Sequence, residues 1–318
     1  MSGFTITAGV SFSGGFTFTE APDTGNTAGW FGGGYAPGGN IYSSVDRITY
    51  ATDTATASVR GPLSLARYGL AAAGNFTYGW FGGGYTPASY PNATLSLVDR
   101  ITYATDTATA SVRGTLSSGR KKLAAAGNTT DGWFGAGYNY PTVFSTVDRI
   151  TYATDTATAS VRGPLSAAIR YLAAAGNTTD GWFGGGYSGG QISRVDRITY
   201  ATDTATASVR GPLSLARNRL AAVGNSDYGW FGGGSVSTVD RITYATDTAT
   251  ASVRGPLGRA GQQLAAAGNT TDGWFGGGNP GPVTTVDRIT YATDTATASV
   301  RGPLSLAKYA LAAAGGLQ

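Results

Sequence analysis

The side chains able to carry out chemistry in this chain are few in kind. Its 318 residues include no cysteine and no histidine, and Glu20 is the single glutamate. A thiol nucleophile, an imidazole base, a disulfide framework and a Cys/His zinc site are therefore excluded. Aspartate, arginine, lysine and tyrosine remain, and from this set we expect no catalytic residues, no bound metal and no cofactor.

Aspartate and arginine stand next to each other at six places, as in Asp46–Arg47. Neighbouring residues of a strand point to opposite faces of a sheet, so such a pair cannot form one catalytic site. We expect salt bridges and hydrogen bonds between neighbouring structural units instead. A further aspartate follows each pair, Asp53 in the first case, and favours a turn capped by its side chain. A ring of calcium ligands is the weaker alternative.

These residues lie within a 17-residue string, VDRITYATDTATASVRG, that occurs six times without change. Six tryptophans keep the same period, and each is followed by phenylalanine and a glycine-rich triplet, from which only Ala136 departs. The period indicates a repeat architecture in which each unit packs against the next. The copies begin at Val45, Val98, Val147, Val195, Val239 and Val286.

Each unit contains four short candidate strands with the sequences LAAAG, GWFGGG, VDRITYA and TASVRG. Threonine, valine, tyrosine and isoleucine favour strands, and a short alanine segment between glycines cannot nucleate a helix. A blade of four strands cannot bury its own faces, but six blades around an axis can. We therefore predict an all-β, six-bladed β-propeller with the tryptophans packed between blades.

The two ends of the chain predict how the ring closes. The first unit lacks its LAAAG strand, and a spare copy stands at Leu311–Gly315, near the C-terminus. We expect this strand to complete the first blade, so that residues 25–318 form the propeller. Residues 1–24 alternate in hydrophobicity and predict a β-hairpin that anchors the protein or joins copies of the chain. An extra hairpin that covers the propeller is the alternative.

The second repeat has arginine before a hydrophobic inner strand, an aromatic strand ending in glycines, a variable loop, and a Val/Tyr-rich strand followed by Asp and Thr. These features are Arg67, Leu70–Ala73, Trp80–Gly84, Val98–Tyr103, Asp106 and Thr109. This order resembles the repeat of the kelch family. Kelch propellers are mostly binding scaffolds, so the resemblance implies binding rather than catalysis.

The unit is also similar to glycine-rich propeller repeats in structural proteins of tailed phages and marine viruses. This second resemblance implies a tail or fibre component of a phage particle, or otherwise an extracellular protein.

Two regions differ among the repeats, namely the loop between the second and third strands and three residues before the inner strand. Strand direction alternates within a blade, so both regions emerge on one face. The six repeats contribute equal numbers of Asp and Arg, which leaves ten basic residues, all in or beside these regions. This face therefore predicts a basic, tyrosine-rich binding surface. The candidate ligand-binding residues are Arg67, Tyr68, Tyr90, Arg120, Lys121, Lys122, Tyr140, Arg170, Tyr171, Arg194, Arg217, Asn218, Arg219, Gln262, Gln263, Lys308 and Tyr309.

The expected function is non-enzymatic binding of a host-surface glycan, or of another virion protein, through this variable face. A purely structural virion protein and a soluble multivalent lectin are the alternatives, and the lectin would use identical framework sites in every blade. A net charge of +4, with 13% charged residues, argues against a nucleic-acid partner. The chain has no apolar run long enough for membrane insertion.

Overall fold

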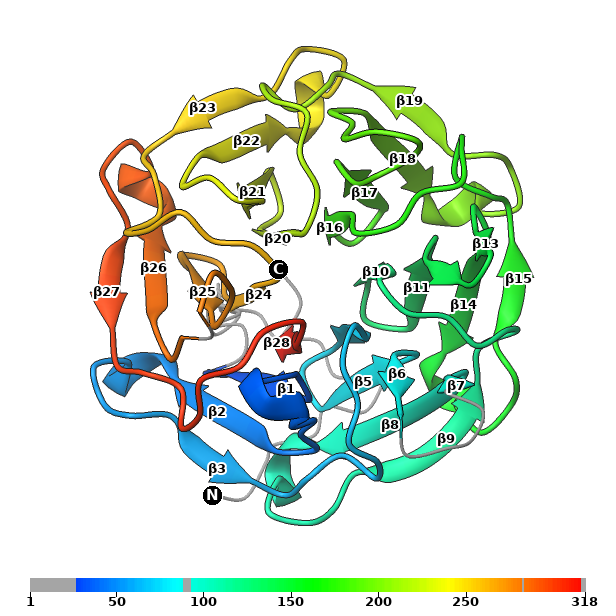
Figure 1. Cartoon of the computed structure of the whole chain (residues 1–318). Coiled ribbons are helices and arrows are strands. Elements are labelled where there is room, and N and C mark those ends of the chain that lie inside the picture. The colour runs from blue at the N-terminus through cyan, green and yellow to red at the C-terminus, as the bar shows by residue number, and fades with distance from the viewer. Residues whose placement is uncertain (1–26, 88–92, 282, 316–318) are drawn as a thin grey trace, which may run out of the picture.

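The protein is an all-β ring of six blades (Figure 1), as the repeats predict. The computed structural model describes residues 27–87, 93–281 and 283–315. The predicted N-terminal hairpin at residues 1–24, and Tyr90, lie outside these ranges. Within them, no helix is long and apolar enough to cross a membrane.

Each blade is a four-stranded antiparallel sheet. From the axis outward, blade 1 consists of β28 (Ala312–Gly315), β1 (Ala28–Gly32), β2 (Val45–Thr49) and β3 (Ser58–Arg60). Blade 2 consists of β4 (Ala71–Gly74), β5 (Tyr78–Gly82), β8 (Leu97–Thr102) and β9 (Ser111–Thr115). Blade 3 consists of β10 (Ala124–Gly127), β11 (Asp131–Gly135), β14 (Val147–Thr151) and β15 (Ser160–Arg162). Blade 4 consists of β16 (Ala173–Gly176), β17 (Asp180–Gly184), β18 (Val195–Thr199) and β19 (Ser208–Arg210). Blade 5 consists of β20 (Leu220–Gly224), β21 (Tyr228–Gly233), β22 (Val239–Thr243) and β23 (Ser252–Arg254). Blade 6 consists of β24 (Ala265–Gly268), β25 (Asp272–Gly276), β26 (Val286–Thr290) and β27 (Ser299–Arg301).

Short elements complete the blades. Two variable loops form two-stranded ribbons, β6 (Tyr85–Thr86) with β7 (Ala93–Thr94) and β12 (Tyr138–Asn139) with β13 (Thr142–Val143). The 3-10 turns are η1 (Pro37–Gly39), η2 (Tyr50–Thr52), η3 (Tyr103–Thr105), η4 (Tyr152–Thr154), η5 (Tyr200–Thr202), η6 (Tyr244–Thr246) and η7 (Tyr291–Thr293).

The C-terminal strand closes the ring. β28 pairs with β1, with Trp30 opposite Ala314, and so supplies the inner strand of blade 1 (Figure 1). This pairing confirms that the first and last units complete each other. It also joins the two ends of the described chain by backbone hydrogen bonds.

Neighbouring blades are joined by the same contacts at all six interfaces. The Trp30 ring of blade 1 stacks on Tyr103 of blade 2 with their centroids 3.8 Å apart, and the Trp30 indole donates to Asp106 at 2.9 Å. Arg47 donates to the same carboxylate at 3.1 Å. The equivalent Trp274–Tyr50 stack and Trp274–Asp53 hydrogen bond join blade 6 to blade 1. The predicted inter-blade roles of tryptophan and arginine are thereby confirmed.

The third strand is shorter than the sequence predicts. It ends at Thr49, because Tyr50 turns into η2 and its ring stacks against the tryptophan of the preceding blade. The turn presents Asp53, which was expected to cap its own hairpin, to that tryptophan and to Arg288. The described residues contain no group of three carboxylates able to hold a metal.

The core consists of six apolar layers between blades rather than one central core. Each layer combines tryptophan and valine of one blade with phenylalanine and isoleucine of the next, as with Trp30, Val45, Phe81 and Ile101. Glycine permits the close approach at the rim, because a Cβ at Gly61 would overlap the backbone carbonyl of Ala108 in the next blade. The identical framework thus fixes the positions of the six variable loops.

Candidate ligand-binding face

The three variable residues before each inner strand have three distinct placements. We call them the first, second and third window positions, in chain order. In blades 1 to 6, the first positions are Lys308, Arg67, Arg120, Ile169, Arg217 and Gly261; the second are Tyr309, Tyr68, Lys121, Arg170, Asn218 and Gln262; and the third are Ala310, Gly69, Lys122, Tyr171, Arg219 and Gln263.

The first position points into the blade. Arg67, Arg120, Arg217 and Lys308 were expected to face a ligand, but their side chains are at most 1% exposed. Each pairs with the aspartate in the third strand of its own blade, which we call the framework aspartate, at N–O distances of 2.9 to 3.3 Å. The pairs are Arg67–Asp99, Arg120–Asp148, Arg217–Asp240 and Lys308–Asp46. Burial lowers the pKa of each basic group, and the charge of the aspartate opposes that shift. The binding prediction must therefore be corrected for these four residues, whose role is structural.

Two blades lack this buried cation. In blade 4 the first position is the buried Ile169, and Arg194 from the variable loop lies 3.7 Å from Asp196. Arg194, also predicted to bind ligand, is thus placed beside a framework carboxylate. In blade 6 the first position is Gly261, and Asp287, only 3% exposed, accepts a hydrogen bond from the Gly258 amide.

The third position forms a closed ring of backbone hydrogen bonds around the mouth of the channel. Each amide donates to the carbonyl of the same position in the preceding blade, over 2.6 to 2.9 Å, and Gly69 accepts from Lys122 and donates to Ala310. All six residues have φ between 54° and 67°. This left-handed conformation costs a non-glycine residue about 1 kcal/mol or more. Five of the six positions nevertheless carry a side chain.

The second position and the first loop residue after the glycine triplet form an outer arc. Over blades 1 and 2 this arc is aromatic. Tyr35 lies 5.3 Å from both Tyr309 and Tyr68, and Tyr68 lies 5.4 Å from Tyr85, measured between ring centroids. We call these four residues the tyrosine sector.

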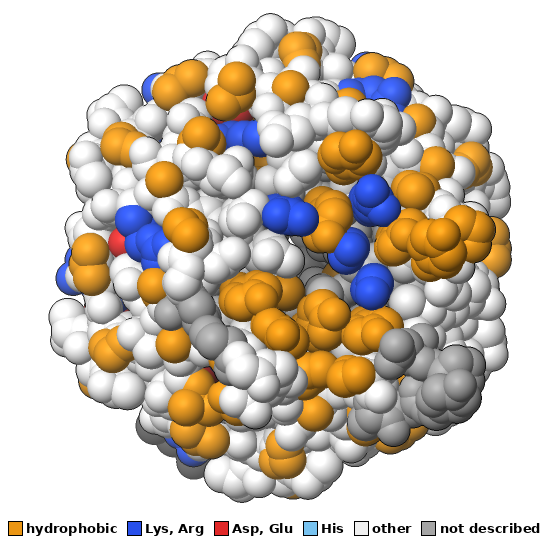
Figure 2. Space-filling view, in the orientation of Figure 1, with side chains coloured by type: hydrophobic (Ala, Val, Ile, Leu, Met, Phe, Trp, Pro, Cys, Tyr) orange, Lys and Arg blue, Asp and Glu red, His pale blue; other side chains and the backbone are white. Residues whose placement is uncertain are grey.

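Over blades 3 to 5 the face is cationic. We call Lys121, Lys122, Arg170 and Arg219 the basic sector. Tyrosine rings hold these cations in place, with Arg170 4.6 Å from the Tyr138 centroid and Arg219 4.6 Å from the Tyr171 centroid. None of the four makes a salt bridge within the described part of the chain, in contrast to the buried first-position cations. Figure 2 shows the division, with Lys and Arg on one side of a central hollow and a group of side chains of the hydrophobic class, which includes tyrosine, on the other.

A 610 Å³ pocket lies in the basic sector, away from the sixfold axis. Its lining has amide and hydroxyl groups as well as cations and tyrosines, and none of the acidic residues in the described ranges belongs to it. Burial raises the pKa of the Tyr171 hydroxyl, but hydrogen bonds and charges from Lys122 and Arg219 outweigh burial and lower it. The lining residues are Lys122, Tyr138, Arg170, Tyr171, Tyr187, Gln191, Asn218, Arg219, Ser235 and Gln262.

The structure thus brings together most of the remaining predicted residues. Tyr140 stands apart, because it is 83% exposed at the tip of a loop and does not line the pocket. Tyr35, Tyr85, Tyr138 and Tyr187 were absent from the prediction, although each directly follows a glycine-rich triplet. That shared position was the available signal.

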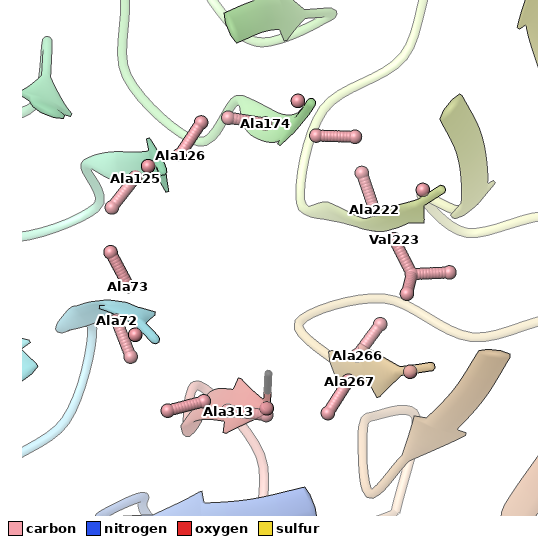
Figure 3. Close-up of a pocket in the computed structure, with 18 residues that line it drawn as sticks. Ala72, Ala73, Ala125, Ala126, Ala174, Ala222, Val223, Ala266, Ala267 and Ala313 are labelled. Atoms are coloured by element: carbon pink, nitrogen blue, oxygen red, sulfur yellow. The ribbon is translucent and has the colours of Figure 1, made fainter. Parts of the chain in front are cut away.

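Two other hollows are less suited to a ligand. The axial channel is lined by alanine, glycine and Val223 of the inner strands, and its volume is 90 Å³ (Figure 3). A groove between blades 4 and 5 includes Trp182, the framework residue that a multivalent lectin would use. Trp182 is 1% exposed and one ring face stacks on Tyr244 at 3.7 Å, so its ring is not open to a sugar.

No protein-family model matches the chain, and no curated protein matches its sequence. The propeller architecture is therefore shown by the structure itself.

Proposed function

We propose that this protein is a non-enzymatic binding protein that engages a surface glycan through its variable face. The observation that carries the proposal is the off-axis pocket, where cations, tyrosine rings and amides converge and no acidic residue of the described structure lies among them. Its 610 Å³ volume is in the range of pockets that enclose small ligands. Amide and hydroxyl groups both donate and accept hydrogen bonds, as sugar hydroxyls require.

The strained third window positions support the same proposal. Glycine would adopt a φ near 60° without strain, yet blades 3 to 6 place Lys122, Tyr171, Arg219 and Gln263 there. The backbone ring needs only the amide and carbonyl of each residue. The side chains therefore have a use beyond closing the ring, and all four line the mouth of the channel.

The proposed setting is a virion, where the protein is a tail or fibre component exposed to the host surface. This part of the proposal rests on the resemblance of the repeats to viral propeller repeats, and the kelch relationship is likewise proposed from the sequence.

A glycan array probed with the purified full-length chain tests the function. We expect binding to a limited set of glycans, and its loss in a Lys122→Gln, Arg170→Asn double variant. An Arg259→Gln variant is the control, because Arg259 lies outside the pocket lining. Absence of glycan binding, together with tight association with virus particles, would instead establish a purely structural role.

A further inference from the structure

We infer that the ligand is an acidic oligosaccharide, bound once per chain, with its anionic group in the basic sector and its following sugars along the tyrosine sector. The inference rests on the proposed function and specifies which class of glycan the pocket takes.

The pocket carries uncompensated positive charge. Lys122, Arg170 and Arg219 line one pocket, and no carboxylate of the described part of the chain lines it with them. Every first-position cation on the same face has an aspartate within 3.3 Å. Burial, together with the neighbouring charge of Lys122, lowers the pKa of Lys121. An anion in this pocket supplies the missing opposite charge through charge-assisted hydrogen bonds.

The cations of the pocket are held in position before a ligand arrives. The Lys122 ammonium lies 4.4 Å from the centroid of Tyr171, and the Arg170 guanidinium lies 5.0 Å from that of Tyr187. The Arg219 guanidinium donates to the Gln262 side chain at 3.2 Å. Long side chains held in this way lose less conformational freedom on binding. The site is therefore prepared for an anionic group of fixed position.

The basic sector is continuous with the tyrosine sector. Lys121 joins the two sectors, because its ammonium lies 3.7 Å from the Tyr85 centroid while its backbone exchanges hydrogen bonds with Tyr138. A chain of sugars that leaves the pocket past Lys121 meets Tyr85, Tyr68 and Tyr35 in turn. These rings offer apolar surfaces with polar hydroxyls, which suit the mixed character of a sugar ring.

The basic pocket occurs once in the ring. The second and third positions of blades 1, 2 and 6 carry neither lysine nor arginine, so the three cations of the pocket come from blades 3, 4 and 5. The basic pocket therefore has no sixfold copies, although the framework beneath it is identical. We therefore expect each chain to bind one acidic group.

The closing experiment uses the full chain on an array that carries carboxylated, sulfated, phosphorylated and neutral oligosaccharides. Hits restricted to acidic glycans support the inference. Comparison of the carboxylated, sulfated and phosphorylated glycans then identifies which anionic group is bound. Equal binding of neutral glycans overturns the inference and leaves the proposed function standing. Absence of any glycan hit overturns both the inference and the proposed function. Hexaglutamate is tested alongside the array as an acidic peptide, and binding of this peptide without any glycan hit overturns both as well.

Titration of the strongest acidic hit with variants then tests the residues. Lys122→Gln and Arg170→Asn copy Gln263 and Asn218, which occupy the same positions in other blades. We expect each to weaken binding about tenfold or more and to reduce its salt dependence. Tyr68→Gln, which copies Gln262, should weaken binding of the oligosaccharide but not of its isolated acidic sugar. The control Arg259→Gln should stay within about twofold. Unchanged affinity in the two cation variants overturns the inference.

Discussion

Arg217 and Arg219 stand two residues apart on the same connection, yet the structure uses them in opposite ways. Arg217 is 1% exposed and its guanidinium bonds to Asp240 and to the carbonyls of Phe231, Gly233 and Thr238. Arg219 is partly exposed, lines the pocket, and has no acidic partner among the described residues. The comparison shows that basic residues on one face divide into those that hold a blade together and those free to meet a ligand.

The largest expected effect separates these two arginines directly. Arg217→Ala should lower the free energy of unfolding by about 3–5 kcal/mol, because it leaves a buried carboxylate without its cation. Arg219→Ala should lower it by about 1 kcal/mol or less, since alanine already occupies the same conformation at Ala310. Denaturant unfolding of both variants measures the difference. Equal destabilisation would remove the structural half of the comparison.

Replacing a framework aspartate by asparagine should change the free energy of unfolding in opposite directions in blades 2 and 6. Asp99→Asn should cost about 3 kcal/mol, because it leaves the Arg67 guanidinium buried without a counter-charge. Asp287→Asn, the same substitution in blade 6, should stabilise the protein by about 1 kcal/mol at neutral pH. Among the described residues Asp287 has no ion-pair partner, and only the Gly258 hydrogen bond and the charge of the partly exposed Arg259 oppose the effect of burial on its pKa.

The effect at Asp287 should also depend on pH. Burial raises the pKa of Asp287, so the folded protein holds this proton more tightly than the unfolded chain does. Its contribution to stability therefore falls as the pH rises through the range in which the carboxyl ionises. The advantage of Asp287→Asn should disappear below about pH 3, where the carboxyl is protonated in both states. Destabilisation at neutral pH would contradict the account of blade 6.

A third test compares the closing interface with an internal one. Asp53 joins blade 6 to blade 1, whereas Asp155 makes the same contacts between blades 2 and 3. Asp53→Ala and Asp155→Ala should each cost about 2 kcal/mol, because each removes an indole hydrogen bond and an arginine partner. Thermal or denaturant unfolding measures both. A clearly smaller cost at Asp53 would mean that the ring is less firmly closed than its other interfaces.

The smallest expected effect concerns the tyrosine sector. Tyr68→Gln should change the free energy of unfolding by less than about 0.5 kcal/mol, since this surface position already holds Gln262 in blade 6. Circular dichroism during denaturant unfolding would reveal a larger loss. Such a loss would assign the tyrosines to structure and would weaken their role along the glycan.

The architecture was predictable from the sequence because the repeats are identical and the spare LAAAG segment marks the closing strand. The division within the window was not. Arg120, Lys121 and Lys122 read as one basic run, but Arg120 is buried within its blade, the backbone of Lys121 pairs with Tyr138, and Lys122 adopts a left-handed φ of 63° at the mouth of the channel. The framework aspartate of each blade, which favours a positively charged partner when buried, was the feature of the sequence that indicated a buried cation. The pairing stayed hidden because Asp99 and Arg67 meet only through the fold.

The stoichiometry of glycan binding tests the central claim most directly, namely that the variable face and not the repeated framework binds the ligand. Isothermal titration of the full chain with the strongest acidic glycan should give one site per chain. Six equivalent sites per chain would contradict the account and would place binding on the identical grooves between blades.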